Sequence, residues 1–250
     1  MKINRDAVTV GVIIPVRNEE ASITKVLQDI PEEIKAVVVV VDNGSSDATV
    51  CFAQESGAVV LHEEIPGYGR VMAKGIQYFE DKPVDIIVFL DGDYSDYPRE
   101  MTKLIEPIIN NGIDLVVSTR LNPLYDKNSL PLHVVWGNRM VVFFMNLLFR
   151  TNHTDLGPFR AIRYDRLIQL QMQDLDYGWT VEMQTKAKLI GLKVEEVPVK
   201  YRQRIGQSKI SGTIKGSILA GSKMLYTLIK LRLISVGNIR AKYIRSRDCS

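Results

Sequence analysis

The 250-residue sequence predicts an α/β fold in which helices flank a mostly parallel sheet. Its first half alternates short β-branched apolar runs with segments of helical spacing. The apolar runs show no polar alternation, which is typical of strands buried on both faces of a parallel sheet. The chain is 46% hydrophobic, with 10 Pro and 17 Gly, and this ordinary globular composition excludes collagen, low-complexity disorder and a disulfide scaffold.

Five strands are expected from the continuous apolar runs. Pro15 closes the first run, and the second holds five consecutive valines. The expected strands are residues 8–14, 36–41, 58–61, 84–90 and 115–118.

Four helices are expected between these strands. The first places Ile23, Val26 and Leu27 on one face, and the last has a proline in its first turn. The expected helices are residues 19–30, 47–55, 68–79 and 98–110.

Polar clusters follow three of the expected strands at their carboxyl ends. These ends meet at one edge of a parallel sheet, where α/β proteins bind ligands. Any one cluster alone would be typical of a turn or a helix cap, but their coincidence predicts a ligand site. The clusters are Arg17-Asn18-Glu19, Asp42-Asn43-Gly44-Ser45 and Asp91-Gly92-Asp93.

The third cluster is a candidate metal site. Asp91 and Asp93 are one residue apart and can converge on a hard cation, and Gly92 allows a tight turn between them. Oxygen ligands suit Mg²⁺ or Mn²⁺, which would bridge the phosphates of a nucleotide. The alternative is an acidic turn, but the position after the fourth strand favours the metal.

The other clusters can contact a nucleotide. Asp42 and Asn43 could accept from or donate to a base or ribose, and residues 17–19 precede a helix. Lys74 lies on the helix that follows a glycine-bearing turn at 66–70. The chain contains neither the dinucleotide-binding nor the P-loop glycine pattern, which favours a nucleotide-sugar site.

Charge is distributed unevenly along the chain. Residues 201–250 hold six Arg and five Lys against one acid, Asp248, which gives +10 against −7 for the first 200 residues. A basic tail indicates an anionic partner such as phosphate groups, nucleic acid or a membrane surface, and the alternative is a solvated helix. We expect residues 1–212 to form the catalytic domain and residues 213–250 a basic amphipathic helical segment.

Two apolar stretches bear on membrane attachment. Residues 214–236 carry spaced Lys and Arg, which suits a helix lying in the membrane interface. Residues 132–149 are interrupted by His133 and Arg139. Neither stretch is expected to span a membrane, because a spanning helix needs about 18 uncharged residues.

The order of the motifs resembles the family 2 glycosyltransferases of GT-A fold. Elements of the second half are similar to the polyprenyl-phosphate and dolichyl-phosphate sugar synthase branch, and the resemblance covers about residues 8–235. The first set comprises Pro15, Asn18-Glu19, Asp42-Asn43-Gly44-Ser45 and Asp91-Gly92-Asp93. The second set comprises Thr154-Asp155-Leu156-Gly157-Pro158-Phe159-Arg160, Gly178-Trp179 and Arg204-Ile205-Gly206-Gln207-Ser208-Lys209.

The resemblance implies roles for individual residues. Asp91 and Asp93 would hold the metal on the donor diphosphate, and Arg120 and Arg139 would meet the acceptor phosphate. The nucleotide pocket would be lined by Pro15, Asn18, Glu19 and Asp42. A C-terminal loop would close over the phosphates with Arg204, Ser208 and Lys209.

The implied reaction is an inverting transfer from a nucleotide-diphosphate sugar, UDP-glucose-like or else GDP-mannose, to a polyprenyl phosphate. A hydroxyl acceptor, soluble or glycan, is the alternative, and it would need Asp155 as general base. A sugar-1-phosphate nucleotidyltransferase and a non-catalytic binding module are weaker alternatives. No nucleic-acid partner is expected.

Cysteine usage and the amino terminus bear on the compartment. Cys51 and Cys249 are far apart and form no CxxC pair, so a zinc site built on thiolates is not expected. The low cysteine content favours a reducing compartment. No apolar leader is apparent at the amino terminus. We expect a cytoplasmic protein attached peripherally to the cytoplasmic face of the membrane.

Overall fold

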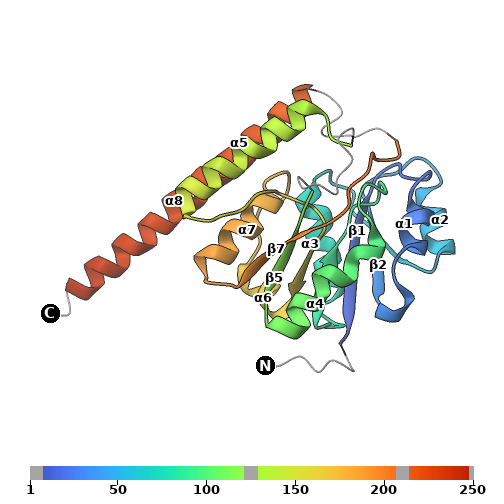
Figure 1. Ribbon diagram of the computed structural model, residues 1–250, viewed down its shortest axis with the longest axis horizontal. Coiled ribbons are helices and arrows are strands. Elements are labelled where there is room, and N and C mark those ends of the chain that lie inside the picture. The colour runs from blue at the N-terminus through green and yellow to red at the C-terminus, as the bar shows by residue number, and fades with distance from the viewer. Residues whose placement is uncertain (1–7, 121–128, 207–213, 248–250) are drawn as a thin grey trace.

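The computed structural model describes residues 8–120, 129–206 and 214–247. A seven-stranded mixed sheet lies between two layers of helices, and a pair of long helices runs beside it (Figure 1). This confirms the predicted α/β fold with a mostly parallel sheet. The strands are β1 (Val10–Val16), β2 (Val37–Asp42), β3 (Val59–His62), β4 (Ile86–Phe89), β5 (Leu115–Thr119), β6 (Arg160–Arg163) and β7 (Val194–Pro198).

The helices alternate with these strands over much of the chain. Short 3₁₀ turns, η2 (Glu32–Ile34) and η3 (Pro98–Glu100), precede β2 and α4. The α-helices are α1 (Ile23–Gln28), α2 (Thr49–Glu55), α3 (Tyr68–Tyr78), α4 (Met101–Asn111), α5 (Leu132–Phe149), α6 (Tyr164–Leu170), α7 (Trp179–Leu189) and α8 (Ile214–Arg247).

The strand order is β3-β2-β1-β4-β6-β5-β7, and only β6 runs antiparallel to its neighbours. The carboxyl ends of β1, β2, β4 and β5 therefore lie at one edge, as the polar clusters predicted. Because β6 is reversed, its first residue, Arg160, lies at this same edge and pairs with Phe89 of β4 and Val117 of β5.

Alternate residues of the strands enter two buried clusters, one on each face of the sheet. On one face Val12, Ile14 and Val88 pack against α1, α2 and α4. On the other face Ile13 and Phe89 pack against α3, α6 and α7. The core is thus continuous on both faces, as the unbroken apolar strands predicted.

Several element bounds differ from the sequence prediction. The first strand runs through Pro15 to Val16, because pairing with β4 ends at Ile13, so the missing proline N–H costs no ladder hydrogen bond. The helix expected from residue 19 begins at Ile23, because Ser22 turns its hydroxyl to the carbonyl of Gly92, 2.8 Å away. The helix expected from residue 98 is divided into η3 and α4.

Helices α5 and α8 pack against each other, and α7 contacts both (Figure 1). Val141 and Met145 of α5 and Leu228 and Leu231 of α8 share a buried cluster with Val181 of α7. Helix α8 therefore contributes to the core of the molecule. The assignment of residues 213–250 to a separate segment stays a prediction.

Among the described residues, α5 is a helix long and apolar enough to cross a membrane, judged by length and composition. The sequence pattern did not predict this, because His133 and Arg139 interrupt the apolar stretch. The helix is continuous through both residues, and 22% of it is buried inside the molecule.

Candidate active site

The acidic loop after β4 is held firmly against its neighbours. The Leu90 amide donates to the carbonyl of Ile13, 3.2 Å away, and the Ser22 hydroxyl holds the carbonyl of Gly92. A Cβ at position 92 would lie 2.7 Å from a methyl group of Val16, so only glycine allows this approach. The loop thus presents Asp91 and Asp93 at the carboxyl edge of the sheet.

Asp93 is buried, with 3% of its surface exposed, and its carboxylate forms an ion pair with Arg204. Its other oxygen accepts from the Ser95 amide at 2.9 Å, and its carbonyl accepts from the Ile205 amide at 3.0 Å. The segment around Arg204 therefore lies against the acidic loop. Burial raises the pKa of the Asp91 carboxyl, while the charges of Arg204 and Arg120 oppose that increase.

Two residues that the sequence analysis missed complete this side of the site. Asp96 is buried, and neither of its carboxylate oxygens has a hydrogen-bond partner among the described residues. Burial, together with the charge of Asp91, raises the pKa of Asp96 to about 8. Arg202 donates to the carbonyls of Tyr94 and Asp96 at 2.6 and 3.1 Å and lies over the Tyr94 ring.

Signals for these two residues existed in the sequence. Asp96 is the third acid in a run of six residues, and Arg202 belongs to the same basic element as Arg204. Each alone is typical of a turn or a solvated charge, and only the fold brings them to the acidic loop.

Arg120 and Asp155 form a buried pair beside the acidic loop. The guanidinium donates to both carboxylate oxygens at 2.9 and 3.0 Å, and the Arg120 amide donates at 2.7 Å. Asp155 has no exposed surface. Burial alone would raise the pKa of Asp155, but the charge and hydrogen bonds of Arg120 lower it overall. Asp155 is therefore an ionised carboxylate whose two oxygens both accept from Arg120.

Arg160, at the start of β6, ties this pair to α7. It is 1% exposed and donates to the carbonyls of Gly157 and Thr180 at 3.1 and 3.2 Å. Burial lowers the pKa of Arg160 to about 10. Arg160 belongs to the motif at 154–160, but no role for it could be predicted, because a buried arginine has no distinctive spacing in the sequence.

The first two polar clusters lie together, as predicted. The side-chain oxygen of Asn18 accepts from the Ser46 backbone amide at 2.8 Å, and the Asn18 backbone amide donates to the Ser45 hydroxyl at 2.9 Å. Asp42 accepts from the Ser45 amide at 3.0 Å and lies 3.3 Å from a ring nitrogen of His62. These bonds fix the loops that follow β1 and β2.

Asn43 extends the connection to the turn before α3. Its side-chain amide donates to the carbonyl of Glu63 at 2.7 Å, and its carbonyl oxygen accepts from the Gly67 amide at 3.2 Å. The turn at 66–70 is therefore fastened to the carboxyl end of β2. Lys74 is half-buried on the helix that follows.

The remaining predicted residues lie in different places. Pro15 and Arg17 are at the end of β1, and Glu19 follows them, with its amide donating to the Thr49 hydroxyl at 2.7 Å. Arg139 is exposed on α5. Ser208 and Lys209 lie outside the described residues.

Asp91 and Asp93 are the carboxylates that the acidic loop offers to Mg²⁺ or Mn²⁺. Among the described residues, no group of three or more His, Cys, Asp or Glu side chains is arranged to hold a metal ion. Mg²⁺ is commonly held by one or two carboxylates plus substrate phosphates and water. Two carboxylates, Asp91 and Asp93, therefore fit such an ion together with a bound diphosphate. Arg204 would then have to share Asp93 with the cation.

Comparison with known proteins gives a family and a fold. Residues 11–170 match the family model described as glycosyl transferase family 2. An uncharacterised glycosyltransferase of Mycobacterium tuberculosis is 34% identical over 220 residues, covering 86% of this chain and 94% of its own. A dolichyl-phosphate hexose transferase of Haloferax volcanii is 31% identical over 218 residues, covering 85% and 91%.

An undecaprenyl-phosphate mannosyltransferase of Micrococcus luteus is 28% identical over 219 residues, covering 82% of this chain and 88% of its own. Among solved structures, glucosyl-3-phosphoglycerate synthase of Mycobacterium tuberculosis with Mn²⁺, UDP and glucosyl-3-phosphoglycerate aligns with a TM-score of 0.71. It is 21% identical, and the alignment covers 90% of this chain and 80% of the synthase. The fold is therefore the GT-A fold that the sequence motifs implied.

Proposed function

The chain belongs to glycosyl transferase family 2, and from that premise we propose that it moves a sugar from a nucleotide-diphosphate sugar to a polyprenyl phosphate. The observation that carries the proposal is the ion pair between Asp93 and Arg204. It joins the acidic loop after β4 to the basic element that resembles the phosphate-closing loop of the polyprenyl-phosphate branch.

The charges around this pair suit a diphosphate leaving group. Asp91 and Asp93 would hold Mg²⁺ or Mn²⁺, which neutralises the charge of the leaving nucleoside diphosphate when it is bound. Arg204 lies beside the same loop and can donate to the phosphates. Such preorganised cations stabilise the charge that develops as the bond to the anomeric carbon breaks.

The nucleotide would lie along the loops that Asn18, Asp42 and Asn43 hold together. We propose a UDP-sugar such as UDP-glucose, with GDP-mannose as the second candidate. A solved neighbour of the same fold carries UDP, and the M. luteus relative is named for mannose.

The acceptor is proposed to be a phosphate because Asp155, the base that a hydroxyl acceptor would need, is held by Arg120. An anionic phosphate oxygen can attack the anomeric carbon without losing a proton, whereas a hydroxyl needs a general base. Asp155, the candidate base, has a lowered pKa and both oxygens engaged by Arg120. Arg120 and Arg139 are proposed to meet the acceptor phosphate. The alternative, a soluble or glycan hydroxyl acceptor with Asp155 as base, is therefore less well supported.

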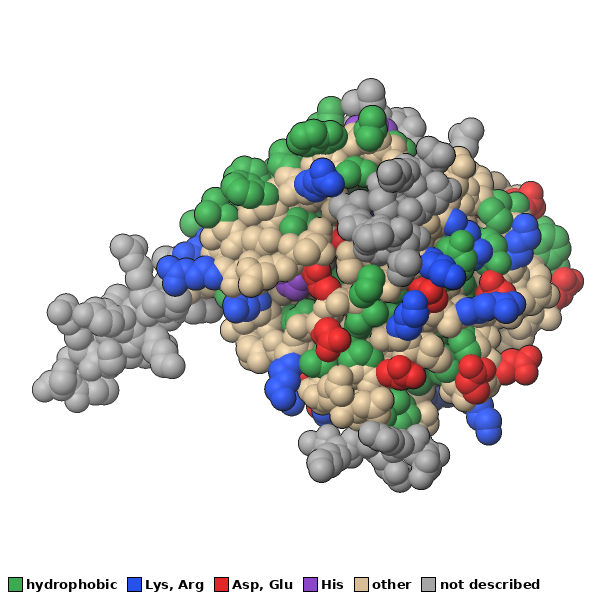
Figure 2. All heavy atoms as spheres, in the orientation of Figure 1, with side chains coloured by type: hydrophobic (Ala, Val, Ile, Leu, Met, Phe, Trp, Pro, Cys, Tyr) green, Lys and Arg blue, Asp and Glu red, His purple; other side chains and the backbone are tan. Residues whose placement is uncertain are grey.

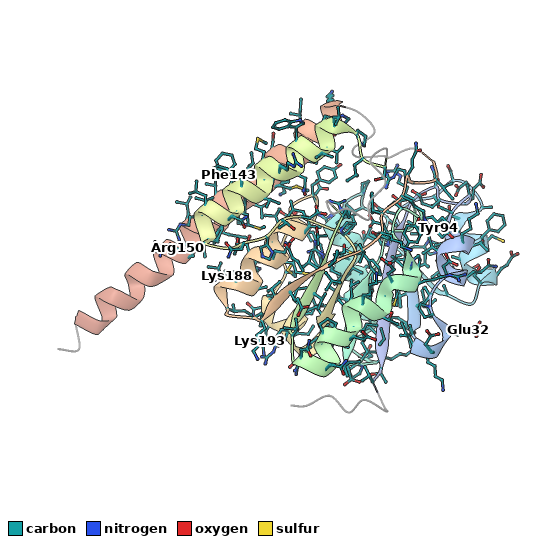
Figure 3. The ribbon with its side chains drawn as sticks, in the orientation of Figure 1. Glu32, Tyr94, Phe143, Arg150, Lys188 and Lys193 are labelled. Atoms are coloured by element: carbon teal, nitrogen blue, oxygen red, sulfur yellow. The ribbon has the colours of Figure 1, made fainter. Side chains whose placement is uncertain are left out.

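Membrane attachment is proposed from the outer face of α5 and α8. Apolar side chains gather along this edge of the molecule, and Phe143 points away from the sheet (Figures 2 and 3). We call the exposed apolar residues of the two helices the apolar ridge. They are Leu132, Trp136, Met140, Phe143, Phe144 and Leu147 of α5 and Ile218, Leu219, Tyr226, Ile229, Leu233 and Ile234 of α8.

The charges on these helices fit an anionic lipid surface. Neither α5 nor α8 contains an acidic residue. Arg139, Lys215, Lys230 and Arg232 are exposed among the apolar residues. Apolar contact combined with basic side chains is what an interfacial helix needs at an anionic membrane. We propose a peripheral position at the cytoplasmic face, where the phosphate of a polyprenyl phosphate would be presented.

A transfer assay tests the proposed function. The purified protein would receive radiolabelled UDP-glucose or GDP-mannose, Mg²⁺ or Mn²⁺, and either a polyprenyl phosphate or the matching polyprenol. We expect label in the lipid phase only with the phosphate. Equal transfer to the polyprenol, or transfer to a soluble acceptor alone, would contradict the proposal.

A further inference from the structure

A carboxylate outside the acidic loop, Asp174, joins the long C-terminal helix to the layers of helices and strands. Asp174 precedes α7, and its Oδ2 accepts from the Thr227 hydroxyl at 3.0 Å and lies 3.3 Å from the Lys223 ammonium, both on α8. Its Oδ1 accepts from the amides of Asp176 and Gly178 at 2.9 and 3.1 Å. One side chain thus connects α8 to the amino end of α7.

Asp174, Gly178 and Thr227 are packed closely at this junction, with no room for even one added carbon atom on Gly178. A Cβ at position 178 would lie 2.3 Å from Asp174 Oδ2 and 2.4 Å from the Thr227 hydroxyl oxygen. Thr227 is 4% exposed. Movement of α8 along its axis must therefore displace Asp174 or break its hydrogen bonds.

The backbone of the same segment supports the amino end of α3. A Cβ at position 69 would lie 2.1 Å from the carbonyl oxygen of Asp174, and the Arg70 amide donates to the Leu175 carbonyl at 3.2 Å. The amino end of α3 is in turn fastened to Asn43 through the Gly67 amide. Asp174 is therefore linked by direct contacts to the loop after β2, on the nucleotide side of the site.

A second chain of contacts leads to the acidic loop. Trp179, the first residue of α7, lies edge-on to Phe89, with ring centroids 6.3 Å apart. Phe89 is the last residue of β4, immediately before Leu90 and Asp91. Both sides of the proposed donor site thus rest on elements that Asp174 connects to α8.

We propose that Asp174 is a positioning residue that transmits the placement of α8 to the donor side of the site, through the amino ends of α3 and α7. The inference rests on the proposed function, because it assigns the nucleotide to the loops next to α3. Loosening this junction weakens donor binding and leaves the chemical step little changed, since Asp174 contacts neither Asp91 nor Asp93 in the described structure.

Glu182 of α7 binds the same segment but makes no hydrogen bond or ion pair to α8 among the described residues, so it can be compared with Asp174. Its carboxylate accepts from the amides of Gln173 and Asp174 at 2.7–3.1 Å and pairs with Lys186 on its own helix. Asp174 therefore contacts α8, whereas Glu182 does not in the hydrogen bonds and ion pairs described. Substitution of Thr227 is the smallest change that alters the contact between Asp174 and α8.

The experiment compares Thr227→Val, which removes the hydroxyl at nearly constant shape, with Thr227→Ser, which keeps it. UDP or GDP binding with Mn²⁺ is measured by calorimetry in the full-length protein, beside donor KM and kcat. We expect Thr227→Val and Asp174→Asn each to weaken nucleotide binding and raise donor KM about five- to tenfold, the scale of one ordinary intramolecular hydrogen bond. Thr227→Ser should restore both values, with kcat within about twofold throughout.

The double variant Asp174→Asn with Thr227→Val should cost less than the sum of the two single changes, because both act on the same junction between Asp174 and α8. A lowered melting temperature with unchanged nucleotide binding and KM would mean that the junction is only structural, and would overturn the inference alone. Additive losses in the double variant would also overturn it. Absence of nucleotide binding by the wild-type protein would overturn the proposed donor, and the inference with it.

Discussion

Arg120 follows β5 and Asp155 precedes β6, and the guanidinium of Arg120 donates hydrogen bonds to both carboxylate oxygens of Asp155. A buried pair of this kind is costly to break, because removing one partner leaves an uncompensated charge. Arg120 also lies with its guanidinium carbon 5.3 Å from the centre of the Tyr201 ring, so the pair is enclosed from several sides. We interpret Asp155 as the group that orients Arg120 toward the acceptor.

Asp155→Asn should therefore lower transfer strongly and destabilise the protein by about 3–5 kcal/mol at neutral pH. The pKa of Asp155 is lowered on folding, so its stabilising contribution is present above its ordinary value of 3.8 and is lost as the pH falls below it. Urea unfolding of the wild-type protein and of Asp155→Asn should show a difference in the free energy of unfolding that is constant between about pH 5 and pH 8. This difference should decrease toward about pH 3. A difference that grows on acidification would contradict this assignment.

A kinetic measurement separates positioning from base catalysis. If Asp155 orients Arg120, combining Asp155→Asn with Arg120→Met should cost less than the sum of the two single changes. Additive losses in kcat/KM, with the acidic limb of the pH profile lost in Asp155→Asn, would instead support the hydroxyl-acceptor alternative, because a general base acts only when it is deprotonated.

Metal dependence follows from the acidic loop. Asp91→Ala or Asp93→Ala should abolish transfer and remove the thermal stabilisation that UDP-sugar with Mn²⁺ gives the wild-type protein. The fold should remain, because both side chains lie outside the apolar clusters and Arg204, the partner of Asp93, is 30% exposed and can be solvated when that partner is lost. Asp81→Ala, an exposed carboxylate between α3 and β4, is the matched control and should behave as wild type. Full activity of either loop variant in the presence of a chelator would rule out the metal role.

The sequence was sufficient to predict the first five strands and the shared edge where their polar clusters meet. Strand β6 was not predicted, because its four residues include two arginines and show no apolar run. Its antiparallel direction brings Arg160 to the site edge, and this reversal depends on packing and not on any local pattern. Strand β7, with its two glutamates, was missed for the same reason.

The site was predicted less completely than the fold. Asp91, Asp93 and the residues of the first two clusters lie together as expected, because strand ends determine their location. The Asp93–Arg204 pair and the Asp174 junction join segments far apart in the chain, and no spacing rule predicts such contacts. Asp96 was missed because an acid in a short polar loop is more often a turn residue.

The acceptor phosphate provides a separate test. Arg139→Ala should raise the acceptor KM about tenfold or more and leave donor hydrolysis without acceptor unchanged, since a lost charge-assisted contact affects only the ligand it binds. Arg150→Ala is the control, because Arg150 is exposed directly after the last residue of α5. Eleven residues separate it from Arg139, about 16 Å along a helix. Equal loss of transfer and donor hydrolysis in Arg139→Ala would mean that Arg139 serves the donor or the fold.

The last prediction concerns the apolar ridge on α5 and α8. The protein should sediment with anionic vesicles of phosphatidylglycerol and phosphatidylcholine more completely than with phosphatidylcholine alone, and salt should release it. Each basic residue near an anionic surface contributes about 1 kcal/mol, and this attraction is screened by salt. The prediction tests the face that carries Arg139, Lys230 and Arg232 beside exposed apolar side chains.

Point substitutions test this face better than truncation after residue 212 would. Leu228 and Leu231 of α8 are buried against α5 and α7, so removal of α8 would expose core surface as well as the ridge. Trp136→Ser combined with Phe143→Ser changes side chains that are 70% and 61% exposed, and should leave the melting temperature nearly unchanged.

The Trp136→Ser and Phe143→Ser variant should lose vesicle binding, and Lys230→Glu with Arg232→Glu should lose mainly the preference for anionic lipid. Ile168→Ser, which alters an exposed apolar residue on α6, is the matched control and should bind as wild type does. Transfer to a polyprenyl phosphate embedded in bilayers should fall with binding, while transfer to a short, detergent-soluble analogue should persist. If the wild-type protein stays in the supernatant with anionic vesicles at low salt, the ridge is not a membrane surface, and a soluble acceptor becomes the better hypothesis.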